Sequence, residues 1–189
     1  MKVIAFNGSP RKNGNTSRLI EEVFRPLRDA HVECERIDIA ANGLRGCTAC
    51  RGCFNNGGSC VIKDDLNDWF AKAAAADAVI IGSPTYFANV SAETKALLDR
   101  FGLLGRATGA FVRKPFAAVV AARRAGAVPT FDAINHMAQI NQMLIVGSSY
   151  WNIGIGREPG EVESDGEGMA NMANLGENLA WLLDKLGKA

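Results

Sequence analysis

Short apolar runs alternate with segments of helical periodicity along the whole chain. The runs that predict strands are residues 2–6, 31–39, 78–81, 115–121 and 143–146. Between these runs and after the last one, apolar residues recur at helical spacing, as in Leu19, Ile20, Val23, Phe24 and Leu27. Parallel neighbouring strands need crossover connections, which are usually helices. The alternation therefore predicts an α/β fold, with a five-stranded parallel sheet and helices on both faces.

Length and charge exclude several classes of protein. The 189 residues suit a single domain spanning residues 1–189, and 21 Lys and Arg against 20 Asp and Glu leave a net charge of +1. No basic block is present, so we expect no nucleic-acid partner. The apolar stretches are shorter than the roughly 18 residues that cross a bilayer, and the N-terminus does not resemble a signal peptide. We therefore expect a cytoplasmic protein with no membrane partner.

The segment after the first predicted strand, residues 7–17, concentrates hydroxyls, glycines and two cations where a helix begins. Free N–H groups at a helix N-terminus bind phosphate well. The segment has neither a Walker loop nor the Gly-x-Gly-x-x-Gly fingerprint, which favours a terminal monophosphate over a triphosphate or pyrophosphate. The alternative is a polar turn whose Ser or Asn only caps the helix.

The segment after the third predicted strand, residues 82–90, carries the adjacent aromatics Tyr86 and Phe87. Ligands of open α/β sheets bind beyond the carboxyl ends of the strands, so these rings are positioned to stack on a planar ligand. The alternative is ordinary packing over a neighbouring loop.

Together the two segments resemble the flavodoxin-like NADPH-dependent FMN reductase family, through Gly-Ser-Pro-Arg-x-x-Gly-Asn-Thr-Ser at 8–17 and Gly-Ser-Pro-x-Tyr at 82–86. The resemblance implies a three-layer sandwich with strand order 2-1-3-4-5. It implies that the FMN phosphate is held by Ser9, Arg11, Asn15, Thr16 and Ser17. It also implies that the isoalloxazine is bordered by Pro84, Thr85, Tyr86 and Phe87.

A loop at about residues 40–63 holds Cys47, Cys50, Cys53 and Cys60, in the spacing C-x2-C-x2-C-x6-C. Three thiols at successive intervals of three resemble the run that surrounds an iron–sulfur cluster more than the paired motifs of structural zinc. The spacing is similar to that of the iron–sulfur flavoproteins. That resemblance implies a [4Fe-4S] cluster on these four cysteines, a ferredoxin-like electron donor and a homo-oligomer, either dimer or tetramer. Zinc, or thiols without metal, are the alternatives.

Two further segments follow predicted strands. Arg123 and Arg124 follow the fourth, where a cation would stabilise a reduced flavin or meet a nicotinamide cofactor's phosphate; two solvated arginines are the alternative. Residues 147–152 follow the fifth and are expected at the same edge of the sheet, with Trp151 buried by default.

The chemistry expected of the chain is flavin-centred. Only two histidines occur and no G-x-S-x-G elbow is present, which argues against a hydrolase. A flavin carries its own chemistry, so we expect no catalytic side chain. We predict an FMN-dependent NAD(P)H oxidoreductase that passes electrons to a second acceptor. The alternatives are an electron carrier working through a [4Fe-4S] cluster and FMN, and a thiol–zinc module without flavin.

Overall fold

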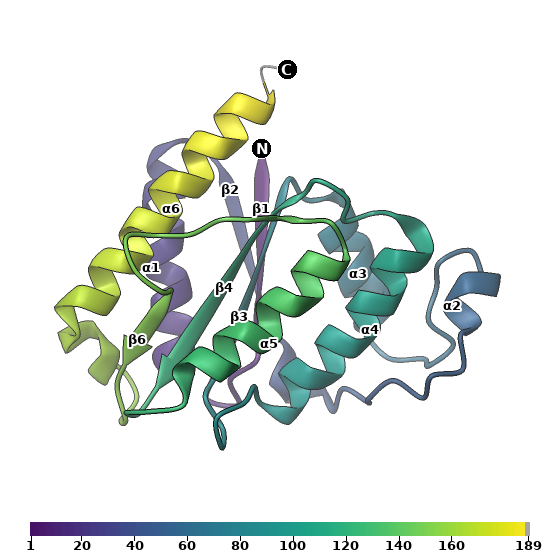
Figure 1. The fold of residues 1–189 in the computed structure, drawn as a ribbon, viewed down its shortest axis with the longest axis horizontal. Helices are drawn as coiled ribbons and strands as arrows, with labels where there is room; N and C mark the ends of the chain where they lie inside the picture. Colours follow the sequence, from purple (N-terminus) through teal and green to yellow (C-terminus); the bar gives the residue numbers. More distant parts are fainter. Residues whose placement is uncertain (188–189) are drawn as a thin grey trace.

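A twisted sheet of parallel strands forms the centre of the molecule (Figure 1). The computed structural model describes residues 1–187. The sheet order is β2-β1-β3-β4-β5, and β6 also pairs with β4. The strands are β1 (Lys2–Asn7), β2 (Glu33–Asp38), β3 (Ala78–Pro84), β4 (Pro115–Ala122), β5 (Leu144–Ile145) and β6 (Ile153–Ile155). This order confirms the predicted flavodoxin-like sandwich.

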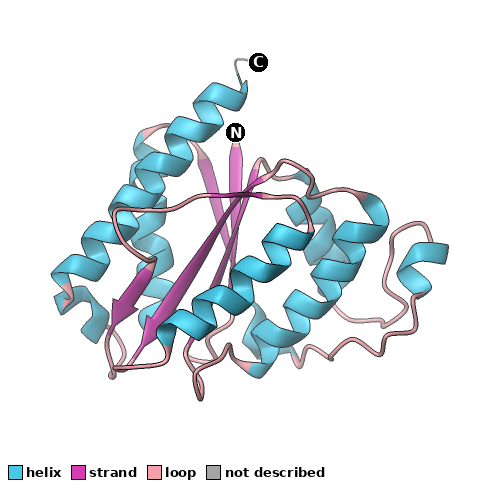
Figure 2. Cartoon of the chain, in the orientation of Figure 1, coloured by secondary structure: helices cyan, strands magenta, loops and turns pink. Residues whose placement is uncertain are grey.

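Helices cover both faces of the sheet (Figure 2). One face is covered by α1 (Asn15–Asp29) and α6 (Gly166–Gly187). The other is covered by α3 (Leu66–Ala75), α4 (Ala92–Thr108) and α5 (Ala127–Ile140). The short elements are η1 (Ile39–Asn42), α2 (Gly52–Asn55) and η2 (Glu161–Ser164). Among the described helices, none combines the length and apolar character needed to cross a membrane.

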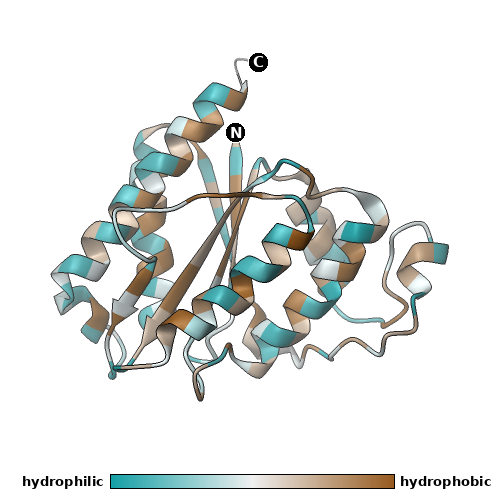
Figure 3. Cartoon of the chain, in the orientation of Figure 1, coloured by the Kyte–Doolittle hydropathy of each residue, from teal (hydrophilic) through white to brown (hydrophobic). Residues whose placement is uncertain are grey.

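The core consists of two apolar layers separated by the sheet. Strand side chains alternate between the layers, so Ile4 and Phe6 pack with α3 and α4 while Val3 and Ala5 pack with α1 and α6. Because both faces are covered, the central strands are apolar along most of their length (Figure 3). This packing fixes the carboxyl ends of β1, β3 and β4 relative to one another.

The predicted fifth strand is wrong in extent. Only Leu144–Ile145 pairs with the start of β4, and β6, which the sequence analysis missed, pairs with the end of β4. Between the two strands, the buried Asn152 donates from Nδ2 to the carbonyl of Ala118 at 3.0 Å, so a side chain satisfies the middle of β4. Residues 147–152 therefore lie partway along the sheet edge. The Trp151 side chain is 49% exposed instead of buried.

Candidate functional site

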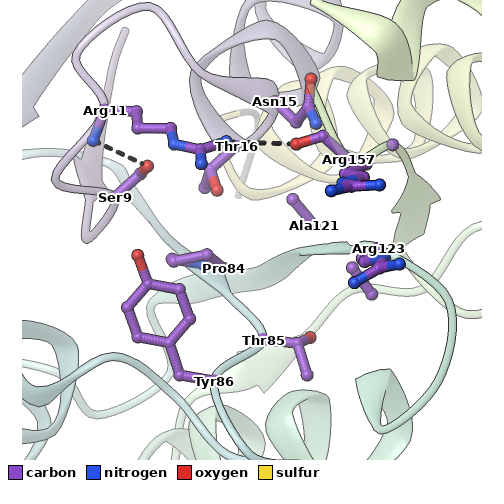
Figure 4. A pocket seen from close by; sticks show the side chains of 12 residues that line it. Ser9, Arg11, Asn15, Thr16, Pro84, Thr85, Tyr86, Ala121, Arg123 and Arg157 are labelled. Atoms are coloured by element: carbon purple, nitrogen blue, oxygen red, sulfur yellow. Dashed lines mark hydrogen bonds between the residues drawn. The ribbon is translucent and has the colours of Figure 1, made fainter. Parts of the chain in front are cut away.

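A cavity of about 290 Å³ lies where β1, β3, β4 and β6 end (Figure 4). We call it the rim pocket. Its lining residues are Ser9, Arg11, Asn15, Thr16, Pro84, Thr85, Tyr86, Ala121, Ala122, Arg123, Gly156 and Arg157. The two predicted segments thus converge on one cavity, as the sheet order requires.

The first wall is the loop between β1 and α1. The Arg11 N–H donates to Ser9 Oγ at 3.2 Å, and Arg11 Nη1 donates to the carbonyl of Arg157 at 3.1 Å. The N-terminus of α1 follows Gly14 and has no side-chain cap. Ser17 does not line the pocket, because its buried hydroxyl donates back to the Gly14 carbonyl at 2.8 Å. The loop therefore presents uncapped helical N–H groups beside a cation.

Two residues that line the pocket carry buried hydroxyls that have no hydrogen-bond partner among the described residues. They are Oγ1 of Thr16, in the first turn of α1, and Oγ1 of Thr85, in the loop after β3. Buried polar atoms are nearly always paired in folded proteins, so an unpaired one calls for a partner from outside the chain. The positions fit a ligand with a polar group at the helix N-terminus and a polar edge near β3.

The second wall is the loop after β3. The Thr85 N–H donates to the carbonyl of Ala121 at 2.8 Å, and Tyr86 pairs with Asn89 across a tight turn. Phe87, at the tip of this turn, has a φ of 50°. Its ring is fully exposed and does not line the pocket, so the structure separates two aromatics that the sequence analysis grouped. Tyr86 alone faces the cavity (Figure 4).

The third wall is formed by the loops after β4 and β6. Arg123 and Arg124 are both exposed, but Arg123 lines the pocket and Arg124 does not. Gly156 and Arg157 line it too, and the sequence analysis missed both because it did not find β6. Asn15 Oδ1 accepts from the N–H of Gly160 at 2.9 Å and so holds the chain after Arg157 against α1.

The rim pocket is strongly cationic. Arg11, Arg123 and Arg157 line it, and among the described lining residues none carries a carboxylate. Arg157 pairs with Glu158, which lies outside the lining, at 3.2 Å between Nε and Oε1. The lining itself is positively charged, which favours an anionic ligand. A cavity of this size lies at the lower end of the range for small-molecule sites.

The four predicted metal ligands line a second, much smaller space, which we call the cysteine hollow. It is bordered by Cys47, Cys50, Cys53 and Cys60 together with Arg100 and Leu104 of α4. The loop that carries the cysteines leaves the carboxyl edge after β2 but runs back along α4 to α2 (Figure 1). The hollow therefore lies beside α4 and not at the carboxyl edge of the sheet.

Within the described part of the chain, no three His, Cys, Asp or Glu side chains are gathered closely enough to hold a metal ion. The donor set itself fits a thiolate-bound metal, because all four cysteines are free and line one hollow. The Ala49 N–H donates to Cys47 Sγ at 3.4 Å. The Gly52 N–H and the Thr48 hydroxyl lower the pKa of Cys50, which favours the thiolate form that binds metal.

Comparisons with known proteins agree with this architecture. The model of the NADPH-dependent FMN reductase family matches residues 1–158. The chain is 34% identical to an iron–sulfur flavoprotein of Methanocaldococcus jannaschii, with 100% of both chains covered. It is 32% identical to an iron–sulfur flavoprotein of Methanosarcina thermophila, covering 100% of this chain and 98% of that protein.

Among solved structures, the flavodoxin-like WrbA-like protein of Agrobacterium tumefaciens aligns with a TM-score of 0.67 and 18% identity over 97% of each chain. At that identity the match supports the fold alone, and the sequence relatives carry the functional inference. The chain therefore belongs to the NADPH-dependent FMN reductase family and is a flavodoxin-like, FMN-dependent oxidoreductase with iron–sulfur flavoproteins among its relatives.

Proposed function

We propose that FMN binds in the rim pocket and takes electrons from NAD(P)H for delivery to a second acceptor. The observation that carries the proposal is the pair of buried, unpartnered hydroxyls of Thr16 and Thr85 in a cavity lined by arginines and no described carboxylate. When bound, FMN supplies transfer of a hydride or of single electrons, so the chain contributes binding and electrostatics.

The first wall would bind the phosphate. The uncapped N-terminus of α1, the Thr16 hydroxyl and the Arg11 guanidinium offer N–H, O–H and positive charge to a dianion. Ser9 keeps the loop in this shape by accepting from the Arg11 N–H. Asn15 Oδ1 accepts from the Gly160 N–H, so the amide would offer its Nδ2 donors to the phosphate.

The other two walls would border the ring. Pro84, Thr85 and Tyr86 offer an apolar surface, a hydroxyl and an aromatic face. Arg123 and Arg157 bring positive charge to the remaining side, which would favour an anionic reduced ring or the phosphate of a nicotinamide cofactor.

Stopped-flow reduction of the FMN-loaded protein tests the donor. Rapid mixing with NADPH or NADH in the absence of oxygen should bleach the flavin absorbance. The cofactor that gives the faster bleaching is the preferred donor. Reduction by neither, with reduction by a ferredoxin-like donor, would contradict the NAD(P)H assignment while leaving FMN binding intact.

A second candidate function is favoured by the cysteine hollow. Four free thiols lining one space, together with the names of the relatives, support a [4Fe-4S] cluster on Cys47, Cys50, Cys53 and Cys60. The chain would then carry single electrons from a ferredoxin-like donor through cluster and FMN, as a homo-oligomer of two or four subunits.

Free cysteines persist in reducing compartments, which supports a cytoplasmic location.

Metal analysis of anaerobically purified protein tests the cluster. We expect about four irons per chain with equal acid-labile sulfide, beside flavin bands in the absorbance spectrum. The double variant Cys50→Ser/Cys53→Ser should lose the iron and keep FMN. Cys34→Ser is the matched control, since Cys34 is a half-buried thiol on β2 that does not line the hollow. Iron-free wild-type protein would contradict the cluster, and zinc without flavin would identify a thiol–zinc module.

A further inference from the structure

The wall of the cysteine hollow contains a buried cation that the proposed function does not use. Arg100 lies on α4, borders the hollow, and its side chain is only 1% exposed. Burying a guanidinium is costly unless its N–H donors are paired with acceptors.

Two of the three guanidinium nitrogens of Arg100 are fixed. Nη1 donates to Asp64 Oδ2 at 2.5 Å and to the carbonyl of Arg45 at 3.1 Å, and Nη2 donates to Asp64 Oδ1 at 2.8 Å. This two-pronged pairing holds the plane of the guanidinium in one orientation. The third nitrogen, Nε, is buried and has no hydrogen-bond partner within residues 1–187.

Cys60 is fixed on the neighbouring side of the hollow. Its backbone N–H donates to Asn67 Oδ1 at 2.8 Å, and Asn67 Nδ2 donates to its carbonyl at 3.0 Å. Asn67 therefore holds the backbone of Cys60 beside α3 while Asp64, three residues earlier in the chain, holds Arg100. Arg100 and Cys60 both border the hollow, so the guanidinium and this cysteine share one space of about 20 Å³.

We propose that Arg100 is a positioning residue for metal binding in the cysteine hollow, with its free Nε–H directed to thiolate sulfur on the Cys60 side. The inference rests on the proposed use of the hollow as a metal site. Outer-shell donors of this kind orient the ligands and offset their charge, and their loss typically weakens metal binding 10- to 100-fold. An unpaired buried donor inside a rigid ion pair is otherwise an uncompensated cost.

The test removes the donor without leaving a buried charge behind. The double variant Arg100→Leu/Asp64→Leu deletes both members of the pair, keeps the net charge and replaces them with apolar volume, a change that proteins often tolerate. Arg106→Leu is the matched control, because Arg106 lies on the same helix, is exposed and does not border the hollow. Circular dichroism spectra of the variants and of wild type are compared to check that each variant is folded.

The probe is Co²⁺ added to reduced, metal-free protein, with thiolate-to-metal absorbance as the signal. We expect the double variant to bind Co²⁺ at least about 10-fold more weakly than wild type, and Arg106→Leu to match wild type. Equal affinity of the double variant and wild type, or no Co²⁺ binding by wild type, overturns the proposal. Because Co²⁺ binding needs no iron, protein that lacks a cluster but shows this loss would refute the cluster and support the role of Arg100.

Where the purified protein contains the cluster, the midpoint potential provides a readout that a purely structural role would not move. A donor to cluster sulfur stabilises the more negative, reduced form, so its removal should make the potential more negative. The potential of Arg106→Leu should equal that of wild type. An unchanged potential in the folded double variant would count against the inference.

Discussion

The rim pocket and the cysteine hollow are built in opposite ways. The rim pocket is enclosed by the ends of four strands and the first turn of α1, and its loops are held by backbone hydrogen bonds such as that from Thr85 to Ala121. The cysteine hollow lies between one side of α4 and a long loop, in which α2 has only four residues. No described residue lines both.

This difference indicates how each site acquires its shape. The rim pocket is open before any ligand binds, because the packed sheet fixes its walls. The cysteine hollow has a volume of only about 20 Å³, and Ala49 and Arg51, between successive cysteines, have φ values of 54° and 57°. Left-handed backbone costs about 1–2 kcal/mol at a non-glycine residue. We expect the fold to preform the first site and a metal to organise the second.

The largest effect should come from the ion pair beside the cysteine hollow. Asp64→Asn leaves the buried Arg100 uncompensated and should lower the free energy of unfolding by about 3–5 kcal/mol at pH 7. Asp132→Asn, on the exposed side of α5, should change little. Urea unfolding measures both, and equal stabilities would show that this pair does not anchor the wall.

The same variant predicts a pH dependence. Burial raises the pKa of Asp64, but the Arg100 guanidinium and the Leu66 N–H outweigh it and hold the pKa below its ordinary value. A depressed pKa stabilises the fold above the unfolded-state value of about 3.9, and this contribution is lost as pH falls through the folded-state pKa. The difference in free energy of unfolding between wild type and Asp64→Asn should therefore become smaller below about pH 4. A difference that grows below this pH would contradict a lowered pKa of Asp64.

The next largest effect tests whether the rim pocket binds the FMN phosphate. Arg11→Ala should weaken FMN binding by about 1.5–3 kcal/mol, the value of a hydrogen bond to a charged group. Arg18→Ala is the matched control, because Arg18 is an exposed arginine of α1 that pairs with Glu163 outside the pocket. Titration of flavin-free protein with FMN, followed by fluorescence, gives both affinities. Equal weakening would indicate a general charge effect instead of a phosphate contact.

Alanine substitutions at two glycines compare how well the loop after β1 and the cysteine loop tolerate added volume. A Cβ at Gly8, in the loop after β1, would lie 1.8 Å from Thr94 Oγ1 and 3.1 Å from the Gly82 carbonyl, whereas a Cβ at Gly46 meets nothing within 4 Å. Gly8→Ala should cost about 1–3 kcal/mol of stability. Gly46→Ala should stay within about 0.5 kcal/mol of wild type. Comparable losses would show that the cysteine loop is as tightly packed as the pocket.

The smallest effect separates two neighbouring aromatics. Tyr86→Ala should weaken FMN binding by about 0.5–1.5 kcal/mol through lost ring contact, while Phe87→Ala should leave it unchanged because that ring is outside the pocket. The same FMN titration measures both. A larger loss for Phe87→Ala would mean that the turn at residues 86–89 folds over the bound ring.

Much of the fold and part of the candidate site could be predicted from the amino-acid order. Apolar periodicity identified β1, β3, β4 and the five long helices α1, α3, α4, α5 and α6. The segments at 7–17 and 82–90 pointed to one edge of the sheet because strand order brings them together. Periodicity failed at β6, whose three residues are too few to show a pattern. That failure hid Gly156 and Arg157.

By itself, the sequence determined the parallel sheet, the family and which residue types are available for binding, because these depend on local pattern and composition. Only the tertiary structure decided which members of a motif face the ligand. Ser17 turns back to Gly14, Phe87 points to solvent and Arg124 lies outside the pocket, although each adjoins a residue that lines it. It also decided that Arg100 borders the cysteines, since a contact across 40 residues depends on how α4 packs and not on spacing along the chain.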